Sequence, residues 1–122
     1  MDLNNLTIKK INQGLKEKEF SAMELARAYL DRIKKDDKKI NAFLTVTEDL
    51  ALTQAKAVDE KISKGEEIDI LAGVPCSLKD VFMVEGIKCT AGSKILENYI
   101  APYDATVVKK LKDRGAVILG KN

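Results

Sequence analysis

The sequence contains no histidine. This absence excludes Ser–His–Asp and Cys–His catalysis and every metal site that depends on imidazole ligands. It contains two cysteines, Cys76 and Cys89, whose separation does not match a CxxC motif. Two isolated cysteines are too few for a disulfide scaffold, and we expect both to be reduced thiols in an intracellular, metal-free protein.

The sequence also lacks long apolar runs. No stretch reaches the roughly 18 uncharged apolar residues that a transmembrane helix requires. The first residues, 1–5, have neither the basic region nor the apolar stretch of a secretory signal. We therefore expect a cytoplasmic protein without membrane contact.

The sequence has no large excess of positive or negative charge. Twenty-one basic and nineteen acidic residues give a formal net charge of +2, which does not by itself indicate nucleic-acid binding. The 122 residues are 45% hydrophobic and 33% charged, a composition typical of one soluble globular unit with a real core.

The composition changes near residue 70. Residues 1–70 contain no proline and two of the seven glycines, whereas residues 71–122 contain both prolines and the other five glycines. Glycine and proline favour loops and turns. We therefore expect residues 1–70 to be mainly helical and residues 71–122 to form strands and loops.

The clearest helix start is an S-x-x-E capping box formed by Ser21 and Glu24, with Phe20 and Leu25 at the positions of a hydrophobic staple. Similar patterns predict three further helices: one capped by Thr7, one running from a Thr47 cap to Gly65, and one running from an Asp104 cap to Gly115.

Apolar and β-prone stretches predict strands at 42–46, 74–82, 87–90 and 116–119. The order is helices first, then strand, strand, helix and strand. This order predicts an α/β fold in which helices cover a sheet.

Lys79 differs in context from the other lysines. It interrupts the apolar stretch 74–82, so a continuous strand would place its ammonium beside a buried layer. Desolvation disfavours the charged amine, and a lysine kept near neutrality can act as a base toward a hydroxyl nucleophile. Asp80 alternates to the opposite strand face, so it need not neutralise Lys79. Lys79 is thus a candidate catalytic residue; a solvated surface charge is the alternative.

Five stretches along the chain carry a family pattern. They are 41–45, LAGVPCSLKD at 71–80, GIKCTAGSKIL at 86–96, PYDATVV at 102–108 and GAVILGK at 115–121. With these stretches the sequence resembles the amidase signature family, and the resemblance extends over nearly the whole chain. Within that family it is most similar to the A subunits of glutamyl-tRNA(Gln) amidotransferases.

The resemblance implies N-terminal helices covering the first strands of a mixed sheet. It also implies that Lys79 belongs to a Ser–cis-Ser–Lys triad, acting as base and acid through the bridging serine while the other serine attacks the amide. Glutamine would be the substrate, and its ammonia would pass to a partner, the B subunit, which uses ATP and magnesium to convert Glu-tRNA(Gln) to Gln-tRNA(Gln). A small third chain, the C subunit, would hold the two together. This chain would bind no cofactor or metal itself and would meet tRNA through its partner.

Two departures from the family pattern are present. The Gly/Ser-rich block that carries both catalytic serines has no counterpart in the sequence, and no Thr or Ser stands between Lys121 and Asn122. We therefore expect residues 1–122 to be the N-terminal portion of an amidase domain, ending before the serine block and inactive alone. We also expect such a piece to self-associate through an exposed edge at residues 116–119.

Other candidates remain beside this interpretation. Ser77 would share a strand face with Lys79 and could form a Ser–Lys dyad, or be a small structural residue. Ser93 either belongs to an active-site loop or caps a short helix. Gly120-Lys121 lacks the rest of a P-loop, which we reject. Lysines at 34, 35, 38 and 39 form a solvated face or contact tRNA.

Two alternative functions also remain open. One is a non-catalytic binding or scaffold module that has the same fold. The other is part of a hydrolase acting on a different small amide.

Overall fold

The computed structural model describes residues 2–122. It contains four α-helices, two short 3-10 helices and three strands within these residues. In chain order they are η1 (Leu3–Asn5), α1 (Ile8–Lys16), α2 (Ala22–Ile40), β1 (Thr45–Val46), α3 (Glu48–Ser63), β2 (Pro75–Leu78), η2 (Lys94–Leu96), α4 (Thr106–Asp113) and β3 (Val117–Lys121).

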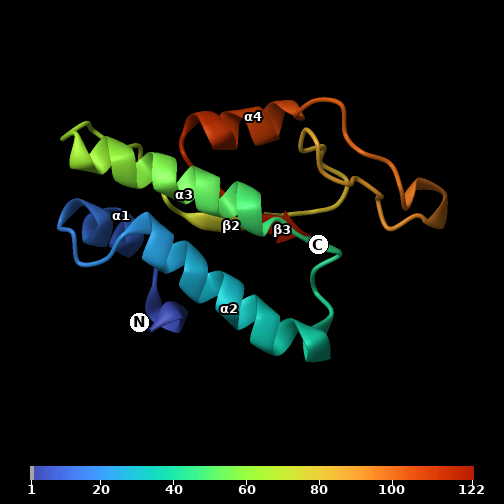
Figure 1. The fold of residues 1–122 in the computed structure, drawn as a ribbon, viewed down its shortest axis with the longest axis horizontal. Helices are drawn as coiled ribbons and strands as arrows, with labels where there is room; N and C mark the ends of the chain where they lie inside the picture. Colours follow the sequence, from blue (N-terminus) through green and yellow to red (C-terminus); the bar gives the residue numbers. More distant parts are fainter. Residues whose placement is uncertain (1) are drawn as a thin grey trace.

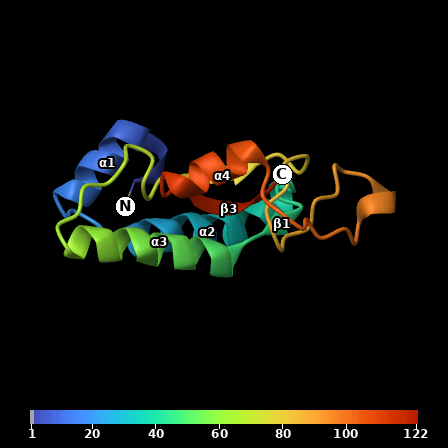
Figure 2. The ribbon, with the colours of Figure 1, turned by 90° about the horizontal axis from the view of Figure 1, so that it is seen from above.

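The three strands form one mixed sheet in the order β1-β3-β2. β3 is antiparallel to β1 and parallel to β2. Helices α2 and α3 lie side by side on one face of the sheet, and α4 lies on the other (Figure 1, Figure 2). The segment between β2 and α4 extends away from these layers at one end of the molecule (Figure 1). This arrangement confirms the expected α/β class with helices covering a mixed sheet.

The helix boundaries follow local capping chemistry. Ser21 accepts a hydrogen bond from the N–H of Glu24, whose carboxylate accepts one from the N–H of Ser21, so the predicted capping box is confirmed. Thr7 caps α1 in the same way by accepting from the N–H of Lys10. Gly65, with φ of +73°, follows the end of α3 in the left-handed conformation that glycine adopts without strain.

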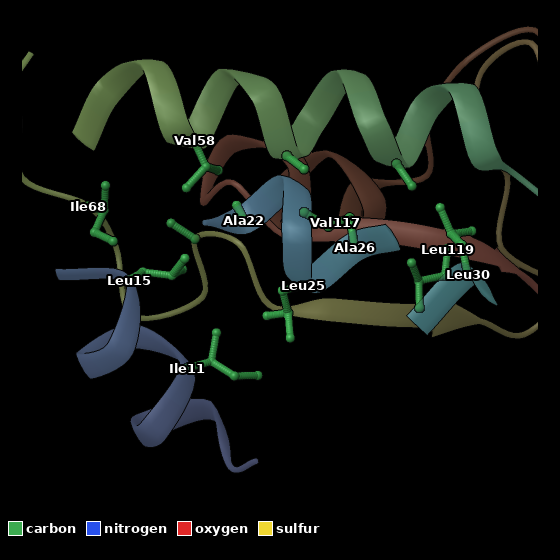
Figure 3. Close-up of a cluster of buried hydrophobic side chains, with 13 residues drawn as sticks. Ile11, Leu15, Ala22, Leu25, Ala26, Leu30, Val58, Ile68, Val117 and Leu119 are labelled. Carbon is green, nitrogen blue, oxygen red and sulfur yellow. The ribbon is translucent and has the colours of Figure 1, made fainter. Parts of the chain in front are cut away.

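The main core lies between α1, α2, α3 and β3. Leu25 and Leu30 from α2 belong to one buried cluster with Val117 and Leu119 of β3. Leu30 lies beside Leu119, and Leu15 of α1 lies at one end of the cluster (Figure 3). A second, smaller cluster on the other face joins β2, β3 and α4 through Leu78, Ile118, Val108 and Val84. Successive residues of β3 therefore pack into different clusters, as a strand with both faces covered requires.

One extra residue interrupts the pairing of β3 with β2. Cys76 pairs with Ile118, but the next residue of β2, Ser77, pairs with Gly120, so Leu119 is a β-bulge. The backbone of Ile118 is bonded to side chains from α3 and its N-cap: its N–H donates to Oε1 of Gln54 at 2.8 Å, and its carbonyl accepts from Oγ1 of Thr47 at 2.9 Å.

Several predicted boundaries were wrong. The stretch 74–82 forms a strand only at Pro75–Leu78, and 87–90 contributes only an isolated bridge between Lys88 and Ile100. The hydroxyl of Thr47 does not cap α3, because it is bonded to Ile118 instead.

The start of α4 was also predicted incorrectly. The helix begins at Thr106 with Ala105 as its N-cap, because the Asp104 carboxylate accepts from the N–H of Glu85 and pairs with Lys112.

The expectation of an exposed edge at 116–119 was wrong as well. β3 lies between β1 and β2, and residues 116–121 are all buried. The central position follows from the chain path, which returns the apolar strand beside two earlier segments. Within residues 2–122 no helix combines the length and apolar character needed to cross a membrane.

Candidate active site

The candidate site lies where β2 and β3 end. The two strands are parallel, so their carboxyl ends meet at the same edge of the sheet, the usual location of sites in such folds. Lys79 and Asp80 follow β2 directly, while Lys121 is the last residue of β3 and Asn122 follows it. The site therefore combines residues about forty positions apart in the sequence.

Lys79 is held by main-chain bonds on both sides. The N–H of Asn122 donates to the carbonyl of Leu78 at 2.8 Å, and the carbonyl of Asn122 accepts from the N–H of Asp80 at 2.7 Å. This is the pattern of a parallel ladder with Lys79 and Asn122 as partners. The backbone of Lys79 is therefore fixed although it lies beyond the end of β2.

The side chain of Lys79 is exposed, whereas we expected it beside a buried layer. The reason is that β2 ends at Leu78 and the chain then turns, with the N–H of Phe82 donating to the carbonyl of Lys79 at 3.0 Å. Ser77 is also exposed, and its Oγ accepts from Nδ2 of Asn122 at 3.3 Å.

The next residue, Asp80, is buried and forms an ion pair with Lys121. Nζ of Lys121 lies 2.8 Å from Oδ1 of Asp80, and the two side chains are 0% and 2% exposed. Burial by itself would raise the pKa of Asp80. The hydrogen bonds from Lys121 and Thr90 outweigh it, so the pKa of the carboxyl lies below its ordinary value.

The same aspartate anchors the loop that follows. Its Oδ2 accepts from both the N–H (2.9 Å) and the hydroxyl of Thr90, and its carbonyl accepts from the N–H of Ala91 at 2.8 Å. Nζ of Lys121 also donates to the carbonyl of Lys88 at 3.2 Å. Asp80 and Lys121 thus fasten residues 88–91 to the strand ends.

This loop forms one wall of a shallow cavity of about 320 Å³ next to β1. Ser93 lies in this cavity wall at the N-cap of η2, but its side chain makes no capping bond. The cavity is lined by Leu44, Thr45, Lys88, Thr90, Gly92, Ser93, Lys94 and Glu97.

The remaining candidates lie elsewhere or form no cluster. Cys76 and Cys89 are free thiols, and burial raises the pKa of Cys76 to about 11. Such a thiol is a poor nucleophile at neutral pH. Lys34 of α2 forms an ion pair with Glu48 of α3 at 2.9 Å, away from Lys79. Among residues 2–122, no group of three or more Cys, Asp or Glu side chains is arranged to hold a metal ion.

Sequence reasoning missed Lys121 and Thr90 as members of this site. One signal was available for Lys121, since a lysine that directly extends the apolar stretch 116–120 has to be buried with a partner or leave the strand. Nothing in the sequence identified that partner as Asp80.

Comparison with known proteins decides the family. The family model described as Amidase matches residues 24–122. The chain belongs to the amidase signature family. The predicted resemblance is therefore confirmed, and the segment around Lys79 lies inside the matched region.

Among curated members of this family, the chain is 54% identical over 121 residues to the A subunit of the glutamyl-tRNA(Gln) amidotransferase of Carboxydothermus hydrogenoformans. The alignment covers 99% of this chain and 25% of that protein. The chain thus spans about a quarter of the length of the curated relatives it matches.

Solved structures of the family have the same fold. The native peptide amidase of Stenotrophomonas maltophilia superposes with a TM-score of 0.92 at 30% identity, over 98% of this chain and 25% of that one. A bacterial aryl acylamidase of the amidase signature enzymes gives a TM-score of 0.87 at 28% identity, over 95% and 24% of the two chains.

Proposed function

We propose that residues 1–122 supply the first strands, the covering helices and the catalytic lysine of a glutamine amidase subunit. This enzyme releases ammonia for the conversion of Glu-tRNA(Gln) to Gln-tRNA(Gln) in the cytoplasm. The observation that carries the proposal is the 54% identity to an amidotransferase A subunit over 121 residues, which include Lys79.

In this proposal Lys79 is the base and acid of a triad completed by two serines from outside residues 1–122. Its amine takes a proton through the bridging serine while the second serine attacks the glutamine carboxamide carbon. The proton then passes to the departing ammonia, leaving an acyl-enzyme for water to cleave. The fixed backbone and exposed side chain of Lys79 support this role, because the amine is free to meet groups from another segment.

The proposed partners are the B and C subunits of the same amidotransferase. The B subunit receives the ammonia and binds ATP, magnesium and the tRNA, and the C subunit holds the two larger chains together. Residues 1–122 need no cofactor for the amidase step, since the triad supplies nucleophile, base and acid.

The test is ammonia release from glutamine by the full-length polypeptide that carries this segment, assembled with its partner chains. We expect Lys79→Ala to abolish release and Lys110→Ala, an exposed lysine on α4, to leave it unchanged. Release that survives Lys79→Ala would contradict the assigned role. A wild-type complex that binds its partners but releases no ammonia would support the scaffold alternative.

A second candidate is the hydrolysis of another small amide. It is favoured by the close superposition on the peptide amidase, whose TM-score is 0.92. Competing glutamine against a C-terminally amidated peptide in the same assay distinguishes the two substrates.

A further inference from the structure

We propose that Lys121 is a positioning residue for Lys79, acting through Asp80. This inference rests on the proposed function only in calling Lys79 catalytic; the contacts that support it belong to the segment itself. They lie at the carboxyl ends of β2 and β3.

The bulge at Leu119 decides where the Lys121 side chain points. Strand residues alternate between faces, so if the unchanged β3 alternated regularly, Lys121 would share a face with Leu119. With the bulge, Lys121 pairs with Leu78 instead, and both lie on the face covered by α4. Asp80, two residues after Leu78, reaches the same side, where the ion pair forms.

The ammonium of Lys121 has two partners from different segments. It donates to Oδ1 of Asp80 at 2.8 Å and to the carbonyl of Lys88 at 3.2 Å. It therefore joins the end of β3, the residue after Lys79 and the start of the 88–91 loop. Because it is 0% exposed, water does not compete for these bonds.

Lys79 lies at the centre of this arrangement without touching it. Its backbone is bracketed on one side by Leu78 and on the other by Asp80, both bonded to Asn122. Side-chain bonds from Lys121 and Thr90 then hold Asp80 itself. Loss of the Lys121 ammonium would leave the buried Asp80 carboxylate without a counter-charge. Because an unpaired buried charge is unfavourable, Asp80 would shift toward solvent and displace the peptide bond that joins it to Lys79.

Lys112 provides a control for the loss of a lysine from an ion pair. It lies on α4 and pairs at the same 2.8 Å distance with Asp104, which also accepts from the N–H of Glu85 and not from a residue beside Lys79. Lys121→Met and Lys112→Met are the same chemical change, but only the first removes a contact to the residue beside Lys79.

The experiment uses the full-length polypeptide with its partner chains and measures two quantities. The first is kcat and KM for glutamine, corrected for the folded fraction by circular dichroism. The second is the rate of acetylation of Lys79 by acetic anhydride as a function of pH, followed by peptide mass spectrometry. The second reports on the Lys79 amine whether or not the protein is a glutaminase.

We expect Lys121→Met to lower kcat by about 10- to 100-fold through misplacement of the base, with KM changed by less than about twofold. We expect it also to shift the pH profile of Lys79 acetylation, while Lys112→Met moves neither quantity. Lys121→Arg keeps the charge and should recover part of both; it also serves if Lys121→Met does not fold.

Unchanged kcat and an unchanged acetylation profile in folded Lys121→Met, or in Lys121→Arg if only that variant folds, would overturn the inference. Equal effects of Lys121→Met and Lys112→Met would also overturn it, since that pattern indicates a general loss of stability. If the wild-type protein releases no ammonia, the proposed function fails, and the acetylation profile alone still decides whether Lys121 positions Lys79.

Discussion

Lys79 and Asn122 are ladder partners: the two main-chain hydrogen bonds of Asn122, 2.8 Å to the carbonyl of Leu78 and 2.7 Å from the N–H of Asp80, enclose Lys79 between them. A lysine at a strand end is normally free to change its backbone conformation. Here the backbone is fixed and only the side chain is free, which suits a base that has to meet a hydroxyl contributed by another segment.

The isolated chain should release no ammonia from glutamine. Its sequence contains no counterpart of the Gly/Ser-rich serine block that the family's mechanism requires. The check is a coupled glutamate dehydrogenase assay on purified residues 1–122. Ammonia release that Ser77→Ala and Lys79→Ala each abolish would instead establish a Ser77–Lys79 dyad.

Lys121→Met should destabilise the chain by about 3–5 kcal/mol, because it leaves the Asp80 carboxylate buried without a counter-charge. Lys112→Met breaks a pair whose side chains are 25% and 17% exposed, so its cost should be about 1 kcal/mol. Urea unfolding of both variants measures the difference. Similar losses would show that water reaches Asp80 in the Lys121 variant.

Acid should destabilise the protein in part through Asp80. Its pKa is lowered in the folded state, so the carboxylate contributes stability that is complete above the ordinary carboxyl pKa of about 4. That contribution is lost as the pH falls through the folded-state pKa. Urea unfolding between pH 7 and pH 2.5 should show a steeper acid limb for wild type than for Asp80→Asn; identical acid limbs would contradict the assignment.

Cys76 should react slowly with iodoacetamide in the folded chain. Burial raises its pKa from 9.0 to about 11, which lowers the thiolate fraction at pH 8 by about 100-fold. The measurement uses Cys89→Ala, so that one thiol is followed, in buffer with and without urea. Equal rates in the two conditions would contradict the expected protection.

Self-association of the isolated chain remains a prediction, but its origin moves from β3 to the segment between β2 and α4. Ile95 there is 93% exposed, and Ile100 and Tyr103 are exposed as well. Light scattering coupled to size exclusion should give a mass above 13.5 kDa that Ile95→Lys reduces. Ile40→Lys, at an exposed residue at the end of α2, is the control. A monomer at all concentrations would contradict the prediction.

Local signals in the sequence predicted the helices well. A capping box such as Ser21–Glu24 is decided within one helical turn, and the neighbours in space are the neighbours in sequence. Thr47 and Asp104 looked equally suitable as caps. Their side chains instead bond to groups 71 and 19 residues away, which no local pattern can anticipate.

The candidate site divides in the same way. Lys79 was identified from its context and from the family resemblance, and its neighbour Asp80 was expected on the opposite strand face. The partner of Asp80 comes from a strand 41 residues later, and it reaches the same side of the sheet only because of the bulge. A bulge depends on the register between two strands, and no particular residue type at Leu119 signals it, so the sequence did not predict it.

Because of the bulge, the number of residues between Ile118 and Lys121 decides which face of the sheet the Lys121 side chain occupies. Removing Leu119 would restore regular alternation and keep Lys121 on the face of Ile118, toward Asp80. Inserting one residue between Ile118 and Lys121, with the bulge kept, would instead move Lys121 out of register with Leu78 and turn its ammonium toward the helices α2 and α3. An indel of one residue in the exposed loop 64–67 would be absorbed without changing any strand register. Tolerance of insertions should therefore fall sharply at the bulge, even for changes that keep every side chain of the site.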